Sequence, residues 1–101
     1  MSCILNSNNQ NLIKTVIFTK KNFTVAAKKA VTVNTWDQGS IPEDYSLLGC
    51  IGFNAGTIAL MPYTFVLNKD GSSSPRIDVR NIDSNPVTVT VQAKFLYIKN
   101  Q

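Results

Sequence analysis

The chain has 101 residues, a formal net charge of +4 and no histidine. This length has room for one domain with a modest core. The absence of histidine excludes Ser-His-Asp and Cys-His nucleophilic sites and every zinc site that needs histidine. The opening residues lack the features of a secretory signal, and no apolar run approaches the ~20 residues of a membrane helix, so we expect no membrane insertion.

The N-terminal half begins with a polar stretch, "SNNQN", that cannot contribute to a core. We therefore predict a flexible segment over residues 1–11. Strand patterns follow over 12–18 and 22–25, with the basic pair of "TKK" in a turn between them. In the next strand, 30–36, valines alternate with polar residues, and the segment 37–44, "DQGSIPED", has the composition of a loop.

The middle of the chain contains "YSLLGCIGFN" (45–54), which is almost continuously apolar. We expect a strand buried on both faces, with Gly49 and Gly52 marking a bulge or a close approach of another backbone. The strand expected over 57–67 contains Pro62, which cannot donate a ladder hydrogen bond. Pro62 therefore favours an edge position or a break.

The C-terminal third begins with a predicted exposed turn, "NKDGSSSP" (68–75), in which Asp-Gly suits a tight turn. Charged residues then alternate with apolar ones over 76–82, as expected of a half-solvated strand. Turn signals recur along the chain at the short spacing of an antiparallel sandwich rather than of βαβ units. We predict an all-β fold, a jelly-roll-like antiparallel β-sandwich that forms one compact domain over 12–101.

The last strand, within "NPVTVTVQAKFLYIKNQ", changes character along its length. One face is apolar throughout and is the predicted core face, formed by Val87, Val89, Val91, Ala93, Phe95 and Tyr97. The other face is polar until Leu96 and Ile98, each of which would forgo about 1.5–3 kcal/mol if left fully exposed. A bulge that swaps the faces, the N-terminal "CIL" or a second subunit could cover them. Leu96 and Ile98 are therefore candidate oligomer-interface residues.

The reactive residues of the sequence match no known catalytic arrangement. Cys3 and Cys50 are too few for a four-cysteine zinc site, and Cys50 lies in an apolar run, where we expect a small buried side chain. The six acidic residues fall in turns or on charged faces, and no phosphate-binding glycine motif is present. We predict that the protein is not an enzyme and holds neither a metal nor a cofactor.

Two binding alternatives remain open. The basic pairs Lys20-Lys21 and Lys28-Lys29 could attract single-stranded nucleic acid, but the neighbouring aromatic residues follow the apolar strand pattern, which argues against such binding. Trp36, beside Asp37 and Gln38, has the stacking and hydrogen-bonding groups of a saccharide site. Trp36 could instead close the end of the core.

The order of several segments resembles that of a known family. "FTVAAKKAVTVN", a loop with proline, "YSLLGCIGFNAGTIAL" and "IDVRNIDSNPVTVTVQAKFLYIK" are similar to the C-terminal, knob-like β-sandwich domains of bacteriophage tail-fibre and head-fibre type virion proteins. That family has a "GY-x-x-x-G-x-x-G" strand, an "R/K-N" corner and a closing "V-T-V-x-A-x-x-L-Y-V/I-K" strand. The resemblance covers about residues 20–99, and Asp44 stands where the pattern has glycine.

The resemblance implies a homotrimeric, non-enzymatic phage or prophage virion protein, made in the bacterial host cytoplasm and assembled with other virion proteins. It also implies contact with a saccharide on the host cell surface, although no binding residue carries over by motif. Loops on rigid sandwiches often bind ligands, so the candidate receptor residues are Trp36, Asp37 and Gln38 in one loop and Asp70 and Ser72 at the predicted tip. A monomeric carbohydrate-binding module is the main alternative, ahead of a nucleic-acid-binding β-barrel.

Overall fold

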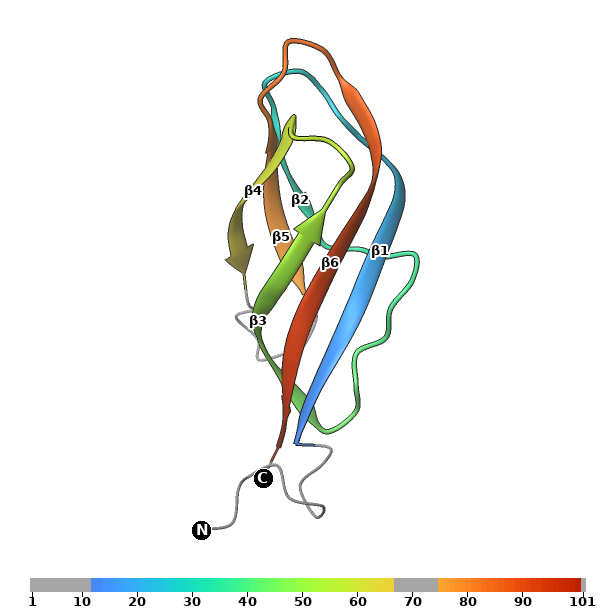
Figure 1. The fold of residues 1–101 in the computed structure, drawn as a ribbon, viewed down its shortest axis with the longest axis vertical. Helices are drawn as coiled ribbons and strands as arrows, with labels where there is room; N and C mark the ends of the chain where they lie inside the picture. Colours follow the sequence, from blue (N-terminus) through green and yellow to red (C-terminus); the bar gives the residue numbers. More distant parts are fainter. Residues whose placement is uncertain (1–11, 67–74, 101) are drawn as a thin grey trace.

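The protein is an all-β antiparallel sandwich, which confirms the predicted fold class. The computed structural model describes residues 12–66 and 75–100. Within them, six strands form two three-stranded sheets (Figure 1). The strands are β1 (Ile13–Val25), β2 (Ala30–Val33), β3 (Tyr45–Asn54), β4 (Leu60–Val66), β5 (Arg76–Asn81) and β6 (Val87–Lys99). The predicted N-terminal segment and most of the predicted tip, with Asp70 and Ser72, lie outside the described residues.

The strand order places the first and last of the described strands side by side. One sheet has the order β1-β6-β3 and the other β2-β5-β4, so the first and last strands pair while the chain crosses repeatedly between sheets. All of these pairings are antiparallel. β6 is the centre of its sheet and β5 the centre of the other. β4 lies at an edge, as Pro62 predicts.

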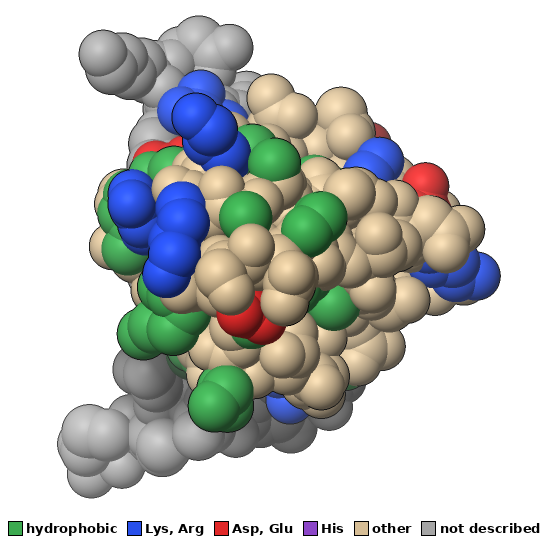
Figure 2. Space-filling view, turned by 90° about the horizontal axis from the view of Figure 1, so that it is seen from above, with side chains coloured by type: hydrophobic (Ala, Val, Ile, Leu, Met, Phe, Trp, Pro, Cys, Tyr) green, Lys and Arg blue, Asp and Glu red, His purple; other side chains and the backbone are tan. Residues whose placement is uncertain are grey.

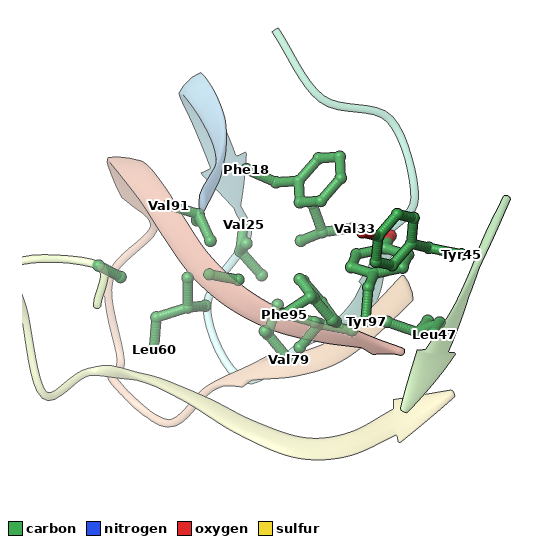
Figure 3. Packing of buried hydrophobic residues seen from close by; sticks show 13 residues of the cluster. Phe18, Val25, Val33, Tyr45, Leu47, Leu60, Val79, Val91, Phe95 and Tyr97 are labelled. Atoms are coloured by element: carbon green, nitrogen blue, oxygen red, sulfur yellow. The ribbon is translucent and has the colours of Figure 1, made fainter. Parts of the chain in front are cut away.

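The core lies between the sheets and is built from alternate residues of the facing strands (Figure 3). On β6, Val91, Ala93, Phe95 and Tyr97 are all almost completely buried. Ile77 and Val79 of β5 meet them from the opposite sheet and are 0% exposed. The alternation read from the last strand and from 76–82 is therefore confirmed.

Two expectations about the strands are wrong. Instead of a turn at "TKK", β1 runs without interruption, and its register shifts between Lys20 and Phe23, where Asn22 has a positive φ of 53°. A bulge absorbs the polar residues because β6 is long enough to pair with both halves of β1. In addition, the strand expected over 30–36 ends at Val33.

β3 is the third correction, because it is buried on one face only. Leu47 is 8% exposed, whereas Leu48 and Ile51 are 51% and 54% exposed. The register shifts between Leu47 and Gly49 and again between Cys50 and Gly52, so the bulges predicted from the two glycines are present. Each bulge adds one residue that has no partner on β6, and that residue points to solvent.

Asn81 is the buried polar residue that joins the two sheets at one end of the sandwich. Its side chain is 0% exposed, and Nδ2 donates to the carbonyl oxygens of Val25, Ala26 and Asn85, at 3.1, 3.3 and 2.8 Å. Its Oδ1 accepts from the backbone N–H of Asp83 at 2.9 Å. One amide thus holds the end of β1 and the turn between β5 and β6.

We predict that Asn81→Ala destabilises the fold by about 2–3 kcal/mol, because several carbonyl oxygens then lose their donor in a buried site. Asn81→Asp should cost at least as much, since a carboxylate would face those carbonyl oxygens. Urea unfolding measures both, with Asn34→Ala as the matched control at an exposed position, expected within about 0.5 kcal/mol of wild type. An Asn81→Ala variant as stable as this control would contradict the role of Asn81.

Tyr97, the largest fully buried side chain, makes the fold sensitive to alkaline pH. Burial raises the pKa of Tyr97 to about 12, against about 10 in an unfolded chain. The folded protein therefore holds this proton more tightly than the unfolded chain does. The resulting stabilisation is complete below pH about 10 and is lost as the pH rises from about 10 to about 12.

We accordingly expect the free energy of unfolding to fall more steeply between pH 10 and about 12 in wild type than in Tyr97→Phe, whatever the stability of the variant at neutral pH. Urea unfolding at a series of pH values gives the two slopes. Because Tyr45, Tyr63 and the lysines are common to both proteins, the difference between the slopes isolates Tyr97. Equal slopes would show that Tyr97 titrates normally.

Candidate subunit interface

Leu96 and Ile98 lie on the outer face of the β1-β6-β3 sheet. β6 alternates strictly, with Phe95 and Tyr97 1% and 0% exposed toward the core and with Leu96 and Ile98 half-buried on the opposite side. The pairing of β6 with β1 is continuous from Val91 to Ile98. A bulge that swaps the faces of β6, one of the three coverings considered, is therefore absent.

Neighbouring strands add apolar side chains to the same face. Ile13 of β1 pairs with Ile98. Ile17, four residues further along β1 and on the same face, pairs with Lys94. Ile13 and Ile17 are 39% and 53% exposed. On the other side of β6, Leu48 and Ile51 of β3 are exposed beside the bulges of that strand. We call this surface the apolar outer face; its members are Ile13, Ile17, Leu48, Ile51, Leu96 and Ile98.

The apolar outer face ends at polar residues on one side, and a shallow hollow lies at this boundary. Lys94 and Gln92, the next outward residues of β6, pair with Gly52 and Asn54, so the surface turns polar in that direction. A hollow of about 170 Å³ lies there, beside Ile17 and Gly52. At Gly49 a Cβ atom would meet nothing within 4 Å, so glycine keeps the backbone beside Leu96 open to the outside.

Sequence reasoning found Leu96 and Ile98 but missed the other four members. Ile13 and Ile17 are separated by Thr15, a spacing that places all three on one face of a strand. Leu48 and Ile51 were assigned to a fully buried strand. Leu48 faces outward because it follows the buried Leu47, whereas Ile51 faces outward only because the first bulge turns Cys50 toward the core. One exposed face on this strand would have predicted Leu48, and a bulge near Gly49 would have predicted Ile51.

Trp36 packs at the end of the core. Its ring lies 5.7 Å from the ring of Phe18 and 6.2 Å from that of Phe95, centroid to centroid, and its Nε1 donates to the carbonyl oxygen of Pro75 at 3.2 Å. The side chain is half-buried. The structure thus places Trp36 where a tryptophan closing the sandwich would lie, with its N–H already bonded.

Asp37 and Gln38 fasten the same loop to β1. The Asp37 carboxylate accepts from the backbone N–H of Lys21 at 2.6 Å, and the backbone of Gln38 pairs with Thr19. Gly39 follows with a φ of 108°, and a Cβ atom there would lie 2.6 Å from the Phe18 ring. The three candidate receptor residues of this loop are therefore adjacent and ordered by β1. Their binding to a saccharide stays a prediction.

Cys50 shows little sign of reactivity. It is half-buried against the core, its Sγ donates to the carbonyl oxygen of Gly52 at 3.2 Å, and burial raises the pKa of its thiol. A raised pKa keeps the thiol protonated near neutral pH, which is the less nucleophilic form. Over 12–66 and 75–100, no group of three or more metal-ligating side chains comes together.

Comparison with protein-family models, with curated proteins and with solved structures found no match for this chain. In the part of the chain that the structure describes, no helix is long and apolar enough to cross a membrane.

If the apolar outer face is a subunit contact, wild type should self-associate at micromolar concentrations, and the double variant Leu48→Ser/Ile51→Ser should be monomeric at the same concentrations. Both side chains are about half exposed within one chain, so the fold should tolerate the change. Multi-angle light scattering on a sizing column gives the mass.

Ile58→Ser is the matched control, because Ile58 is 91% exposed and belongs to the loop between β3 and β4 rather than to the strands of the β1-β6-β3 sheet. It should leave the mass unchanged. A wild type that stays monomeric, or a double variant that assembles like wild type, would contradict the interface.

Proposed function

We propose that this protein is a structural subunit of a bacteriophage virion, of the fibre-tip or head-fibre type, that assembles as a homotrimer. The observation that carries the proposal is the apolar outer face. Six aliphatic side chains from three strands share it, four of them between 39% and 54% exposed. Large contiguous apolar patches on a small β-domain mark contacts with other molecules.

Burial of the apolar outer face would supply the energy of assembly. Each aliphatic side chain that passes from water into an apolar contact contributes up to about 1.5–3 kcal/mol, less what is already buried within the chain. A closed ring of identical copies buries the same face in every subunit and leaves none exposed. A trimer with the β1-β6-β3 sheets turned toward a three-fold axis satisfies this condition.

The sequence resemblance supports the same assembly. The strand that matches the family's closing pattern, "VTVQAKFLYIK", is β6, and it contributes Leu96 and Ile98 to the apolar outer face. The family's "R/K-N" corner falls at Arg80 and Asn81, where Asn81 holds the turns at the end of the sandwich.

The alternatives gain less from the geometry. A carbohydrate-binding module would use the face and N–H of Trp36, but the ring packs against Phe18 and Phe95 and the N–H is bonded to Pro75. For nucleic-acid binding, the ammonium groups of Lys20 and Lys28 are bonded to Thr35 and to the Ile82 carbonyl oxygen. In the virion proposal, residues of the loops contact the host-surface saccharide.

The virion proposal is tested in the strain that encodes the chain. After prophage induction, particles are purified on a density gradient, and the chain is quantified by mass spectrometry against the major capsid protein. We expect it in the particle fraction at a copy number divisible by three. The Leu48→Ser/Ile51→Ser variant should be synthesised but absent from particles. Wild-type protein found only in the particle-free fraction would overturn the proposal.

A further inference from the structure

A second hollow lies on the outer side of the other sheet, at the edge strand β4. It has a volume of about 390 Å³ and is lined by Met61, Pro62, Tyr63, Arg80 and Ile82. Met61 and Arg80 face each other across the β4–β5 pairing, and the backbone N–H of Ile82 donates to the carbonyl oxygen of Ala59. The hollow is separate from the apolar outer face, which belongs to the β1-β6-β3 sheet.

The lining is mostly apolar and is open to solvent. Met61, Tyr63 and Ile82 are 48%, 58% and 44% exposed, and Pro62 is half-buried between them. A methionine adapts its shape to a ligand, and a tyrosine offers a flat apolar ring. The size suits one large side chain or a comparable small group.

Arg80 is the charged group in the lining of the hollow. Its guanidinium forms no hydrogen bond or ion pair with the residues that the structure describes. The ammonium of Lys28 lies close by, since it donates to the carbonyl oxygen of Ile82 at 2.8 Å. Figure 2, a view from above the molecule of Figure 1, shows Lys and Arg side chains beside hydrophobic ones on one flank.

The acidic groups nearby are already bonded. Asp78, two residues before Arg80 on β5, accepts a hydrogen bond from Thr32, and the carboxylate of Asp83 accepts from the backbone N–H of Ser84. The carboxylates of Asp78 and Asp83 lower the local positive charge, but neither forms a hydrogen bond with the Arg80 guanidinium. Among the described residues, the site therefore combines an apolar hollow with a guanidinium that has no partner and can hold a carboxylate through two parallel hydrogen bonds.

A ligand that satisfies both features carries an apolar group and a carboxylate within a few bonds of each other. An internal peptide residue with an apolar side chain has no charge, whereas a C-terminal one has both groups on the same carbon atom. β4 is an edge strand, so its backbone can meet an extended chain, but Pro62 lacks an N–H and the register shifts after it, which prevents a long added strand. These features favour the end of a chain over a continuous strand.

We propose that this hollow binds the C-terminal residue of a partner polypeptide, with an aromatic or large aliphatic side chain against Tyr63 and Met61 and its free carboxylate on Arg80. The site goes beyond the proposed virion function and does not depend on it. It would give the protein a means to hold a second, different chain while the apolar outer face joins its own copies.

The test is fluorescence anisotropy of the full-length protein with a labelled five-residue peptide that ends in phenylalanine. The peptide is used in two forms, with a free C-terminal carboxylate and with a C-terminal amide. We expect the free acid to bind at least about tenfold more tightly, because the amide cannot form a charge-assisted pair with the guanidinium. Arg80→Gln should remove this difference, and a peptide ending in serine should bind at least about tenfold more weakly than the phenylalanine peptide.

Lys21→Gln is the matched control, since it removes one positive charge at an exposed position on β1; it should bind both peptides as wild type does. Equal binding of acid and amide, no binding of either at millimolar protein, or unchanged binding by Arg80→Gln would overturn the proposal. Displacement of the peptide by glucuronate at lower concentration than by phenylpropionate would do so too, by indicating a sugar acid. Loss of self-association in Arg80→Gln would also overturn it, by placing a second copy in the hollow.

Discussion

The strict alternation of β6 is the constraint on which the rest of the structure depends. This strand lies at the centre of its sheet, and its odd-numbered residues from Val91 to Tyr97 fill the middle of the core. Because the side-chain period of a strand is two, burial of Phe95 and Tyr97 forces Leu96 and Ile98 outward. No rearrangement within β6 can cover both sets, so the apolar outer face is a consequence of the core.

The bulges of the neighbouring strands β1 and β3 adjust these strands to β6. β1 and β3 carry their bulges where they pair with β6, whereas β6 keeps a regular alternation. Leu48 faces outward after the buried Leu47, and the first bulge of β3 turns Ile51 to the same side, which widens the apolar surface around Leu96 and Ile98. At the other end, Asn81 ties the end of β1 to the turn between β5 and β6. The β1-β6-β3 sheet therefore has one face buried in the domain's own core and one face with exposed apolar side chains.

Alternation of apolar and polar residues made the faces of several strands predictable from sequence. The faces of β6, the buried valine and isoleucine of β5 and the edge position of β4 all followed from local residue types, because each depends on one strand. The sequence predicted a break in β1 and burial of both faces of β3, and both predictions were wrong. Both strands contain bulges, and a bulge depends on the partner strand, which the local sequence does not contain. The hollow beside Arg80 could not be foreseen either, because it joins β4 to β5 through their register.

The central claim is that the apolar outer face is buried between copies in solution. Methyl NMR with a water-soluble paramagnetic agent measures this directly, residue by residue. The account predicts that the methyl groups of Ile17, Leu48 and Ile51 are protected from relaxation enhancement, whereas that of Ile58, 91% exposed, is strongly affected. Enhancement of all four in proportion to their exposure in the isolated chain would contradict it.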